Sequence, residues 1–301
     1  LSLIISLFFI KNQIIEIIHL EFLLKIIFCS FLFFLIGFID DFLSVNPFIR
    51  LSIQILLSCL VWSFGFQIKL SNLIPNIHNY YPILSSPLIS LIITVIWITG
   101  FTNAINWLDG MDGIVSIFTI IVCLGFIIIS FNLNNTFECI LLANILGCSL
   151  GFLFQNTGQN KMFMGDSGSY FLGFSLSTIG VVSTNNGLIS DEKFYFSDFN
   201  LWVSLMMLFI PFFDMARVII IRLINSKSPF YADKNHIHHF LLAGKYEWKE
   251  IIIILVGLTQ FTSFLSFKLA KITDIKFTLI SLLLLLFCLY TSNKLKLSRL
   301  R

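Results

Sequence analysis

The sequence predicts an all-α protein, built as a polytopic bundle of about ten transmembrane helices. Of its 301 residues, 57% are hydrophobic and only 12% are charged, and the mean hydropathy is +0.93. A soluble domain carries roughly 25% charged residues. A chain this poor in charge cannot cover a globular surface with polar groups, and apolar stretches of nearly membrane-spanning length recur from end to end. The bilayer is therefore its expected solvent.

Ten apolar segments make up the expected bundle. Because backbone polar groups cannot stay unpaired in lipid, each segment is expected to be a helix. In chain order the segments are Leu1–Ile10, Leu20–Ile39, Leu51–Phe66, Pro87–Gly100, Ile114–Phe131, Phe137–Phe154, Tyr170–Val182, Leu201–Phe213, Ile251–Phe267 and Phe277–Tyr290. We see no soluble domain and no repeat, so residues 1–301 are expected to form a single integral-membrane domain. Leu1 lies inside an apolar run, and we expect the natural N-terminus to be missing.

The basic residues predict which side of the membrane each loop faces. If the loops alternate across these segments, 12 of the 19 Lys and Arg residues fall on one side and 7 on the other. The positive-inside rule makes the first side cytoplasmic. The six cysteines stand singly inside apolar runs, which favours small core residues over disulfides or metal ligands.

Four polar clusters interrupt the apolar pattern, all on the side expected to be cytoplasmic. Ionisable groups near the membrane are costly and tend to be kept for pairing or chemistry. Carboxylates pooled opposite arginines and histidines suit a phosphate bridged by Mg²⁺, which prefers oxygen ligands. The clusters are Asp40-Asp41 at the end of one segment; Asn103, Asn106, Asp109 and Asp112 after another; Gly165, Asp166 and Ser169 at the start of a third; and Asp214, Arg217, Arg222, Asp233, His236, His238 and His239 in the longest loop.

Each cluster also has a simpler interpretation. Asp40-Asp41 could cap a helix where water begins, and the two Asp-Gly steps of the second cluster could be ordinary turns. The glycines around Asp166 could serve close helix packing or present backbone N–H groups to an anion. The histidines could form a surface patch or a zinc site, but zinc needs a tetrahedral nitrogen and sulfur set, and no cysteine is nearby. We therefore expect phosphate or sugar contact here.

Taken in order, the four clusters resemble the polyprenyl-phosphate N-acetylhexosamine-1-phosphate transferase superfamily. The resemblance covers nearly the whole chain. It rests on FIDDFLSVNPFIRL from Phe38, NAINWLDGMDGI from Asn103, MGDSGSYFLG from Met164, and PFFDMARVIIIRL through SPFYADKNHIHH from Pro211 to His239. The histidine string HIHH is similar to the branch that uses UDP-N-acetylglucosamine or related sugars. The N-acetylmuramoyl-pentapeptide branch carries three consecutive histidines. The family also usually has a further N-terminal helix and a first cytoplasmic loop, which we expect this sequence to lack.

The resemblance implies an enzyme that moves N-acetylhexosamine-1-phosphate from a UDP-sugar to undecaprenyl phosphate. It implies Mg²⁺, with Mn²⁺ as an alternative, a multi-pass location in the bacterial inner membrane, an active site facing the cytoplasm and a contact with membrane lipid. It implies a first step in making a surface glycan, such as O-antigen or cell wall. We expect no nucleic-acid partner, and a homodimer is compatible with these features.

The same resemblance implies roles for particular residues. A metal is expected at Asp166 and Asn106, and catalytic roles at Asp40, Asp41, Asp109 and Asp112, with Asp40 or Asp41 as a base. Substrate contacts are expected from Asn103, Asn106, Gly165, Ser169, Arg217, Arg222, His236, His238 and His239.

Two other functions remain open on the sequence. A non-catalytic relative would keep the fold without turnover. A cation-coupled transporter would also carry membrane carboxylates, but these are expected near mid-bilayer and often in related halves. Here the carboxylates lie at segment ends on one face.

Overall fold

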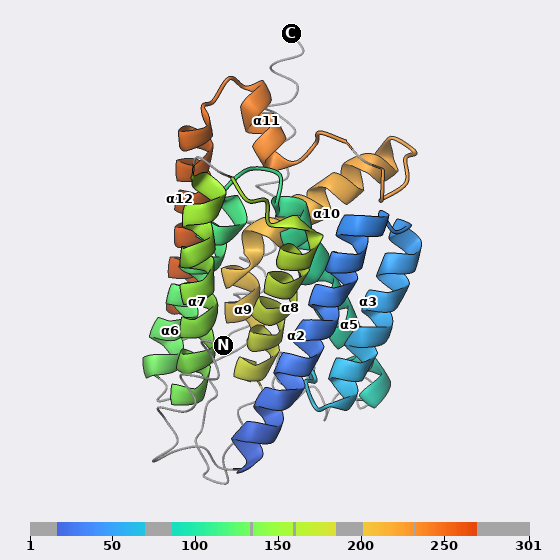
Figure 1. Cartoon of the computed structure of the whole chain (residues 1–301), viewed down its shortest axis with the longest axis vertical. Helices are drawn as coiled ribbons and strands as arrows, with labels where there is room; N and C mark the ends of the chain where they lie inside the picture. Colours follow the sequence, from blue (N-terminus) through green and yellow to red (C-terminus); the bar gives the residue numbers. More distant parts are fainter. Residues whose placement is uncertain are drawn as a thin grey trace.

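In a computed structural model of the chain, the described residues are 17–69, 86–132, 135–158, 161–184, 201–231 and 233–269. Within them the regular elements are all α-helices, as predicted (Figure 1). The helices are α2 (Ile17–Leu43), α3 (Pro47–Ser63), α5 (Pro87–Leu108), α6 (Ile114–Asn132), α7 (Thr136–Thr157), α8 (Gly165–Thr184), α9 (Leu201–Met207), α10 (Phe209–Ile224), α11 (Ile237–Ala243) and α12 (Trp248–Leu269).

Length and composition identify four described helices that could cross a membrane: α2, α5, α6 and α7. A fifth span results if α9 and α10 are counted together, and α3 is apolar but shorter. These features indicate a multi-pass membrane helix bundle. The expected segments Leu1–Ile10 and Phe277–Tyr290 lie outside the described residues.

Four details of the sequence prediction were wrong. Helix α5 does not end at Gly100 but continues to Leu108, so Asn103 and Asn106 lie inside it. The expected span Leu201–Phe213 is two helices, α9 and α10, bent by 75° at Leu208. Helix α10 continues to Ile224, so Asp214, Arg217 and Arg222 lie on a helix and not in the expected loop. A short helix, α11, forms within what was expected to be a loop.

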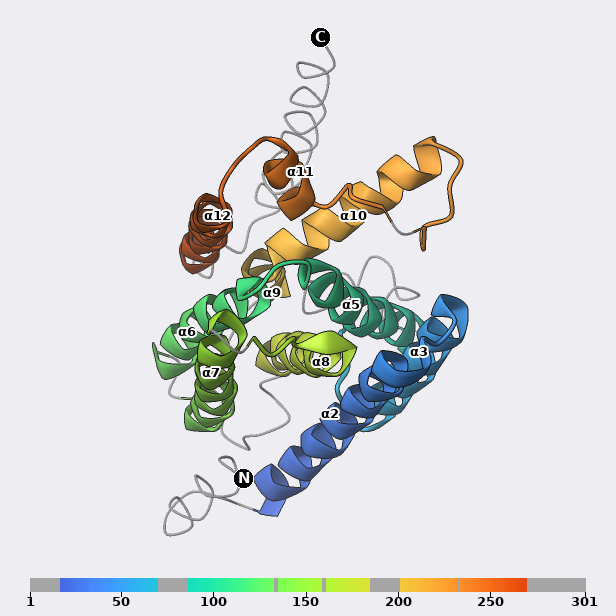
Figure 2. The ribbon, with the colours of Figure 1, turned by 45° about the horizontal axis from the view of Figure 1, so that its top comes forward.

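Helix α8 lies in the middle of the bundle, packed against α2 on one side and α5 on the other (Figure 2). Two glycines permit these close approaches. A Cβ on Gly37 of α2 would lie 2.3 Å from the backbone oxygen of Asp166, and one on Gly173 of α8 would lie 2.7 Å from the Cα of Thr102. Small residues let membrane helices approach in this way. The contact at Gly37 places the end of α2 directly beside the start of α8.

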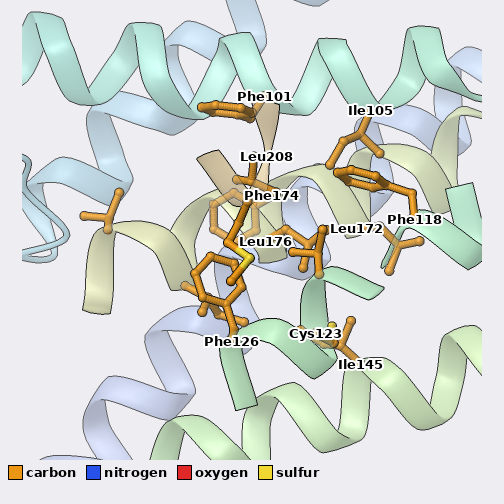
Figure 3. Packing of buried hydrophobic residues seen from close by; sticks show 14 of the residues in the cluster. Phe101, Ile105, Phe118, Cys123, Phe126, Ile145, Leu172, Phe174, Leu176 and Leu208 are labelled. Carbon is orange, nitrogen blue, oxygen red and sulfur yellow. The ribbon is translucent and has the colours of Figure 1, made fainter. Parts of the chain in front are cut away.

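The apolar core occupies the space between α8, α5, α6 and α9. Phe174 and Leu176 of α8 are fully buried, and Phe101 of α5 and Phe126 of α6 are buried with them (Figure 3). Phe33 of α2 stacks on Phe174 with ring centroids 4.5 Å apart. This packing fixes the helices whose ends carry the polar clusters.

Candidate active site

The first two carboxylates of the site come from the end of α2 and the start of α8. Asp40 is 7% exposed, and its Oδ1 accepts a hydrogen bond of 2.7 Å from the backbone N–H of Val45. Its Oδ2 accepts from Nη1 of Arg50, on the first turn of α3. The same Nη1 lies 3.3 Å from Oδ2 of Asp166. One guanidinium nitrogen therefore joins two carboxylates that are 126 positions apart in sequence.

Asn106 contacts the other carboxylate oxygen of Asp166. Its Nδ2 donates to Oδ1 of Asp166 at 2.7 Å and to the hydroxyl of Ser169 at 2.9 Å. Ser169 in turn donates to the backbone oxygen of Asp166 at 3.3 Å. In this arrangement Asn106 orients the carboxylate of Asp166. The role of Asn106 as a metal ligand stays a prediction.

Asp41 turns its carboxylate toward the N-terminus of α8. Its Oδ1 accepts from the backbone N–H of Asp166 at 2.7 Å, and its Oδ2 accepts from that of Ser167 at 3.1 Å. The first N–H groups of a helix have no partner within the helix, so a side-chain oxygen stabilises them. Gly165 makes this approach feasible, since its φ is +67° and a Cβ there would lie 2.8 Å from Oδ2 of Asp41.

Asp109 and Asp112 lie in the turn after α5. Burial, together with the charges of Asp112 and Asp41, raises the pKa of Asp109 to about 6. Asp112 pairs with Lys161, and its backbone oxygen accepts from the indole N–H of Trp248 at 3.2 Å. Asp109 therefore faces a concentration of negative charge that a cation would relieve.

The segment that carries the three histidines, residues 233–239 and here called the histidine loop, is held to α10 by the buried carboxylate of Asp214. Oδ1 of Asp214 accepts from Nη2 of Arg217 at 2.9 Å and from the backbone N–H of Ile237 at 3.0 Å. Its Oδ2 lies 2.9 Å from Nδ1 of His236. Arg217 also donates to the backbone oxygen of Asn235. These bonds fix where α11 begins.

A second arginine joins the same loop to α5. Arg222 is 4% exposed and donates to both oxygens of Asp233, from Nε and Nη2, at 3.1 Å each. Its guanidinium carbon lies 4.8 Å from the ring centroid of Trp107, and the Trp107 ring lies 5.6 Å from that of His236. Burial raises the pKa of Asp233, but Arg222 and Asn235 outweigh it and hold that pKa at about 2. Arg222 is thus bonded to protein groups, and this favours a positioning role over direct phosphate contact.

His238 points from α11 into the turn after α5. Its side chain is 1% exposed, and neither ring nitrogen has a hydrogen-bond partner among the described residues. A Cβ on Gly110 would lie 2.0 Å from Nε2 of His238, so the glycine leaves the space that the ring fills. The rings of His238 and His239 have centroids 4.3 Å apart. The fourth cluster therefore meets the second.

The structure thus brings the four clusters together at one end of the bundle. Asn103 is set apart from the carboxylates. Its Nδ2 donates to the buried Gln54 at 2.6 Å and to the backbone oxygen of Thr99 at 2.8 Å, so it joins α5 to α3. The sequence did not single out Arg50, which counted only toward the charge bias. Its position ten residues after Asp40, inside the motif FIDDFLSVNPFIRL, was the available signal.

The donor set fits Mg²⁺ as an ion shared with substrate. Among the described residues no group of three His, Cys, Asp or Glu side chains is arranged to hold a metal ion. Mg²⁺ commonly takes one or two carboxylates and completes its shell with phosphate oxygens and water. Asp40 and Asp166, both within reach of one guanidinium nitrogen, offer such a pair.

The fold and this site define a class: a membrane helix bundle with clustered carboxylates, amides and histidines at one end. A family model described as glycosyl transferase family 4 matches residues 23–184, more than half of the chain. The chain belongs to this family, and with it to the polyprenyl-phosphate hexosamine-1-phosphate transferase superfamily.

Three relatives illustrate the breadth of the match. A probable undecaprenyl-phosphate N-acetylglucosaminyl 1-phosphate transferase of Bacillus subtilis is 28% identical over 76% of this chain and 61% of its own length. An undecaprenyl-phosphate alpha-N-acetylglucosaminyl 1-phosphate transferase of Thermotoga maritima is 29% identical over 75% of this chain and 67% of its own. A phospho-N-acetylmuramoyl-pentapeptide-transferase of Staphylococcus carnosus is 29% identical over 75% and 70%.

The chain therefore spans less than two thirds of the length of the Bacillus subtilis relative that it matches. Relatives named for N-acetylglucosamine and for N-acetylmuramoyl-pentapeptide match at nearly the same identity. Overall identity thus does not separate the two branches, and the sugar must be argued from the site.

Proposed function

We propose that this protein transfers N-acetylhexosamine-1-phosphate from a UDP-sugar to undecaprenyl phosphate. The products are UMP and an undecaprenyl-diphosphate sugar, the first membrane step of a cell-surface glycan. The observation that carries the proposal is the joining of Asp40, Asp166 and Asn106 by hydrogen bonds at the end of a membrane bundle. The names of the relatives support the same reaction.

The proposed chemistry needs few reacting groups from the protein. Phosphoryl transfer depends on in-line placement and on neutralising oxygen charge. The acceptor phosphate has a second pKa of about 6, so at pH 7 it is mostly a dianion. It attacks the phosphorus next to the sugar, forming one P–O bond as the bond to UMP breaks. A general base adds little to such an attack.

A one-step transfer fits the arrangement of the paired aspartates. A two-step route would need a free carboxylate to form a phospho-aspartyl intermediate. Both oxygens of Asp40 accept hydrogen bonds, from Val45 and Arg50, and both oxygens of Asp41 accept them from the start of α8. The positive charge of Arg50 lowers the nucleophilicity of Asp40, and the positive end of α8 lowers that of Asp41, so neither carboxylate favours attack on phosphorus. Exchange of labelled UMP into UDP-sugar without any lipid would contradict this route.

We place Mg²⁺ or Mn²⁺ at Asp40 and Asp166, whereas the sequence predicted Asp166 and Asn106 as its ligands. Bound there, the ion would neutralise charge on the transferring phosphate. Asn106 and Ser169 keep Asp166 in place for that role, and Arg50 keeps Asp40 beside it. The buried His238 lies next to the Asp109–Asp112 turn, where we place contacts to the nucleotide-sugar diphosphate.

The HIHH string favours N-acetylglucosamine or a close relative as the sugar. The positive-inside bias favours a site at the cytoplasmic face of a bacterial inner membrane. A site at this face has direct access to cytosolic nucleotide-sugars.

A donor panel with purified protein tests the proposal. Protein in detergent is incubated with undecaprenyl phosphate and UDP-N-acetylglucosamine, UDP-N-acetylgalactosamine or their 6-deoxy relatives. UMP release that requires both the lipid and Mg²⁺ is the expected result. A folded protein that releases no UMP from any donor would indicate a non-catalytic relative. Cation-driven solute uptake into vesicles would indicate a transporter.

A further inference from the structure

Arg50 is placed at the site by the turn that joins α2 to α3. Asn46 caps α3 by accepting from the backbone N–H of Phe48 at 2.9 Å, and Pro47 begins the helix. The bond from Val45 to Asp40 folds this turn back over the end of α2. The first turn of α3 therefore presents Arg50 to the carboxylates.

The guanidinium of Arg50 has more donors than the protein uses. It carries five N–H groups and stays protonated. The bonds to Asp40 and Asp166 both come from Nη1. Nε and Nη2 donate to no protein acceptor in the part of the chain that the structure describes. The side chain is 17% exposed. Its guanidinium carbon lies over the ring of Tyr170, 5.6 Å from the ring centroid. These donors form a fork that matches the geometry of a phosphate.

Charge points to an anionic ligand that arrives with a cation. Acidic groups outnumber basic ones here, because Asp40 and Asp166 share the one guanidinium of Arg50, and this disfavours a free phosphate. A divalent ion held by Asp40 and Asp166 would supply positive charge that favours a phosphate, and the unused donors of Arg50 would bind that phosphate as well.

The surroundings of Arg50 favour the lipid acceptor over the nucleotide donor. The turn is edged by large apolar side chains that remain highly exposed. They are Phe42 at 73%, Leu43 at 72%, Phe48 at 63% and Ile49 at 57%. A polyprenyl chain is an apolar tail carrying one phosphate, and this edge would accept the tail while Arg50 meets the phosphate. A uridine and a sugar diphosphate have no comparable apolar part.

We propose that Arg50 binds the phosphate of the polyprenyl acceptor and holds it beside Asp40 and Asp166. This inference rests on the proposed function. It assigns the acceptor to the α2–α3 turn and leaves the donor to the turn after α5 and the histidine loop.

Steady-state kinetics of Arg50→Gln and Arg50→Lys test the assignment. The KM for undecaprenyl phosphate is expected to rise about 10- to 100-fold in Arg50→Gln, the effect of losing hydrogen bonds to a charged group. The KM for the UDP-sugar should change less than about threefold. The KM of Arg50→Lys for undecaprenyl phosphate should lie between those of the wild type and Arg50→Gln, because lysine keeps the charge but lacks the forked pair of donors. Equal increases in both KM values would overturn the proposal.

Mn²⁺ binding, followed by electron paramagnetic resonance without substrates, separates acceptor binding from bracing of the carboxylates. Arg50→Gln removes the positive guanidinium beside Asp40 and Asp166. The variant should therefore bind Mn²⁺ with unchanged or higher affinity. Weaker Mn²⁺ binding that accounts for the whole kinetic defect would assign Arg50 to bracing alone and overturn acceptor binding. Lys25→Gln is the matched control, since Lys25 pairs with Glu21 near the other end of α2. Its kinetics should equal those of the wild type.

Direct binding keeps the inference testable if the proposed reaction fails. If no donor yields UMP, the proposed function is wrong. The thermal shift caused by undecaprenyl phosphate with Mg²⁺ is then compared in wild type, Arg50→Gln and Arg50→Lys. A shift lost in Arg50→Gln supports acceptor binding. An unchanged shift contradicts it. If the variants do not fold, binding of undecaprenyl phosphate to the wild type is measured in competition with inorganic phosphate or with undecaprenol. Competition by undecaprenol alone would overturn the assignment of the phosphate.

Discussion

Asp41 holds the backbone of Asp166. Its Oδ1 accepts from the Asp166 N–H at 2.7 Å, and its Oδ2 accepts from the next N–H, that of Ser167, at 3.1 Å. Asp40, one position earlier, instead joins the side chain of Asp166 through Arg50. The two neighbouring aspartates therefore have different roles. Asp41 stabilises the start of α8, and Asp40 belongs to the charged group that it forms with Arg50 and Asp166.

This difference predicts unequal effects of Asp41→Asn and Asp40→Asn. Asn keeps one acceptor oxygen for the N–H groups at the start of α8, so Asp41→Asn should lower kcat by about tenfold or less. Asp41→Ala should lower the free energy of unfolding by about 1–2 kcal/mol. Asp40→Asn should lower kcat by about 10³-fold or more, because it removes a charge at the proposed metal site. The measurements are kcat and thermal denaturation in detergent. Equal losses for the two Asn variants would remove the capping interpretation of Asp41.

Asp166→Asn should abolish turnover while leaving the protein folded. Asn can still accept from Asn106, but it lacks the charge needed to hold Mg²⁺ beside Asp40. We expect a loss of about 10³-fold or more in kcat, and Mn²⁺ binding should weaken with it. Glu21→Gln, at the other end of α2, is the control and should retain both properties. Wild-type activity in Asp166→Asn would refute the metal assignment.

Gly110→Ala should displace the ring of His238. The new Cβ would lie 2.0 Å from Nε2, closer than atoms can approach, so either the ring or the turn must move. We expect Gly110→Ala and His238→Ala to lower kcat/KM by similar amounts, each less than Asp166→Asn. The double variant should lose little more than either single one, since both act on one contact.

Gly147→Ala is the control for this cycle, because a Cβ there meets no atom within 4 Å. It should leave kcat/KM unchanged. Full additivity of the Gly110 and His238 effects would show that the two residues act separately.

Protonation of His238 should make the protein less stable in acid. Burial, and then the charge of His239, lowers the pKa of His238 from 6.5 to about 4, so the folded protein keeps this ring neutral. Between pH 6.5 and 4 the unfolded chain binds a proton that the folded one does not. The stability that the neutral His238 ring contributes is therefore fully present above pH 6.5 and is lost as the pH falls toward 4.

The check is the melting temperature of wild type and His238→Asn from pH 7.5 to 4. The wild-type value should fall more steeply than that of the variant between pH 6.5 and 4. Parallel curves across that window would show that His238 does not carry the effect.

The main features of the fold and the meeting of the clusters were predictable from composition and order. Low charge predicted a membrane bundle, and polar residues at segment ends on one face predicted that they meet. The extent of α5 was not predictable in this way. Asn103 and Asn106 look like loop residues in sequence, but bonds to Gln54 and Asp166 on neighbouring helices keep them inside the helix.

The break between α9 and α10 also escaped the prediction, because hydropathy carries no information on bends. Pro211 gives the physical reason. A proline clashes with the carbonyl four residues before it, and that residue is Met207, where α9 ends. The role of Arg50 depends on a contact across helices, which spacing along one chain does not reveal.

The last prediction concerns Arg222, which the sequence suggested as a phosphate partner. Its guanidinium bonds both oxygens of Asp233 and lies 4.8 Å from the ring centroid of Trp107. If it acts by docking the histidine loop on α5, Asp233→Asn should impair the enzyme as Arg222→Gln does, with the double variant hardly worse than either. Direct phosphate binding by Arg222 predicts instead that Arg222→Gln alone raises the KM for UDP-sugar while Asp233→Asn has little effect. Lys227→Gln, which removes an exposed cation near Tyr231, is the matched control and should behave as wild type. Steady-state kinetics on the wild type, the two single variants, the double variant and the control distinguish docking from binding, because only docking requires both partners of the ion pair.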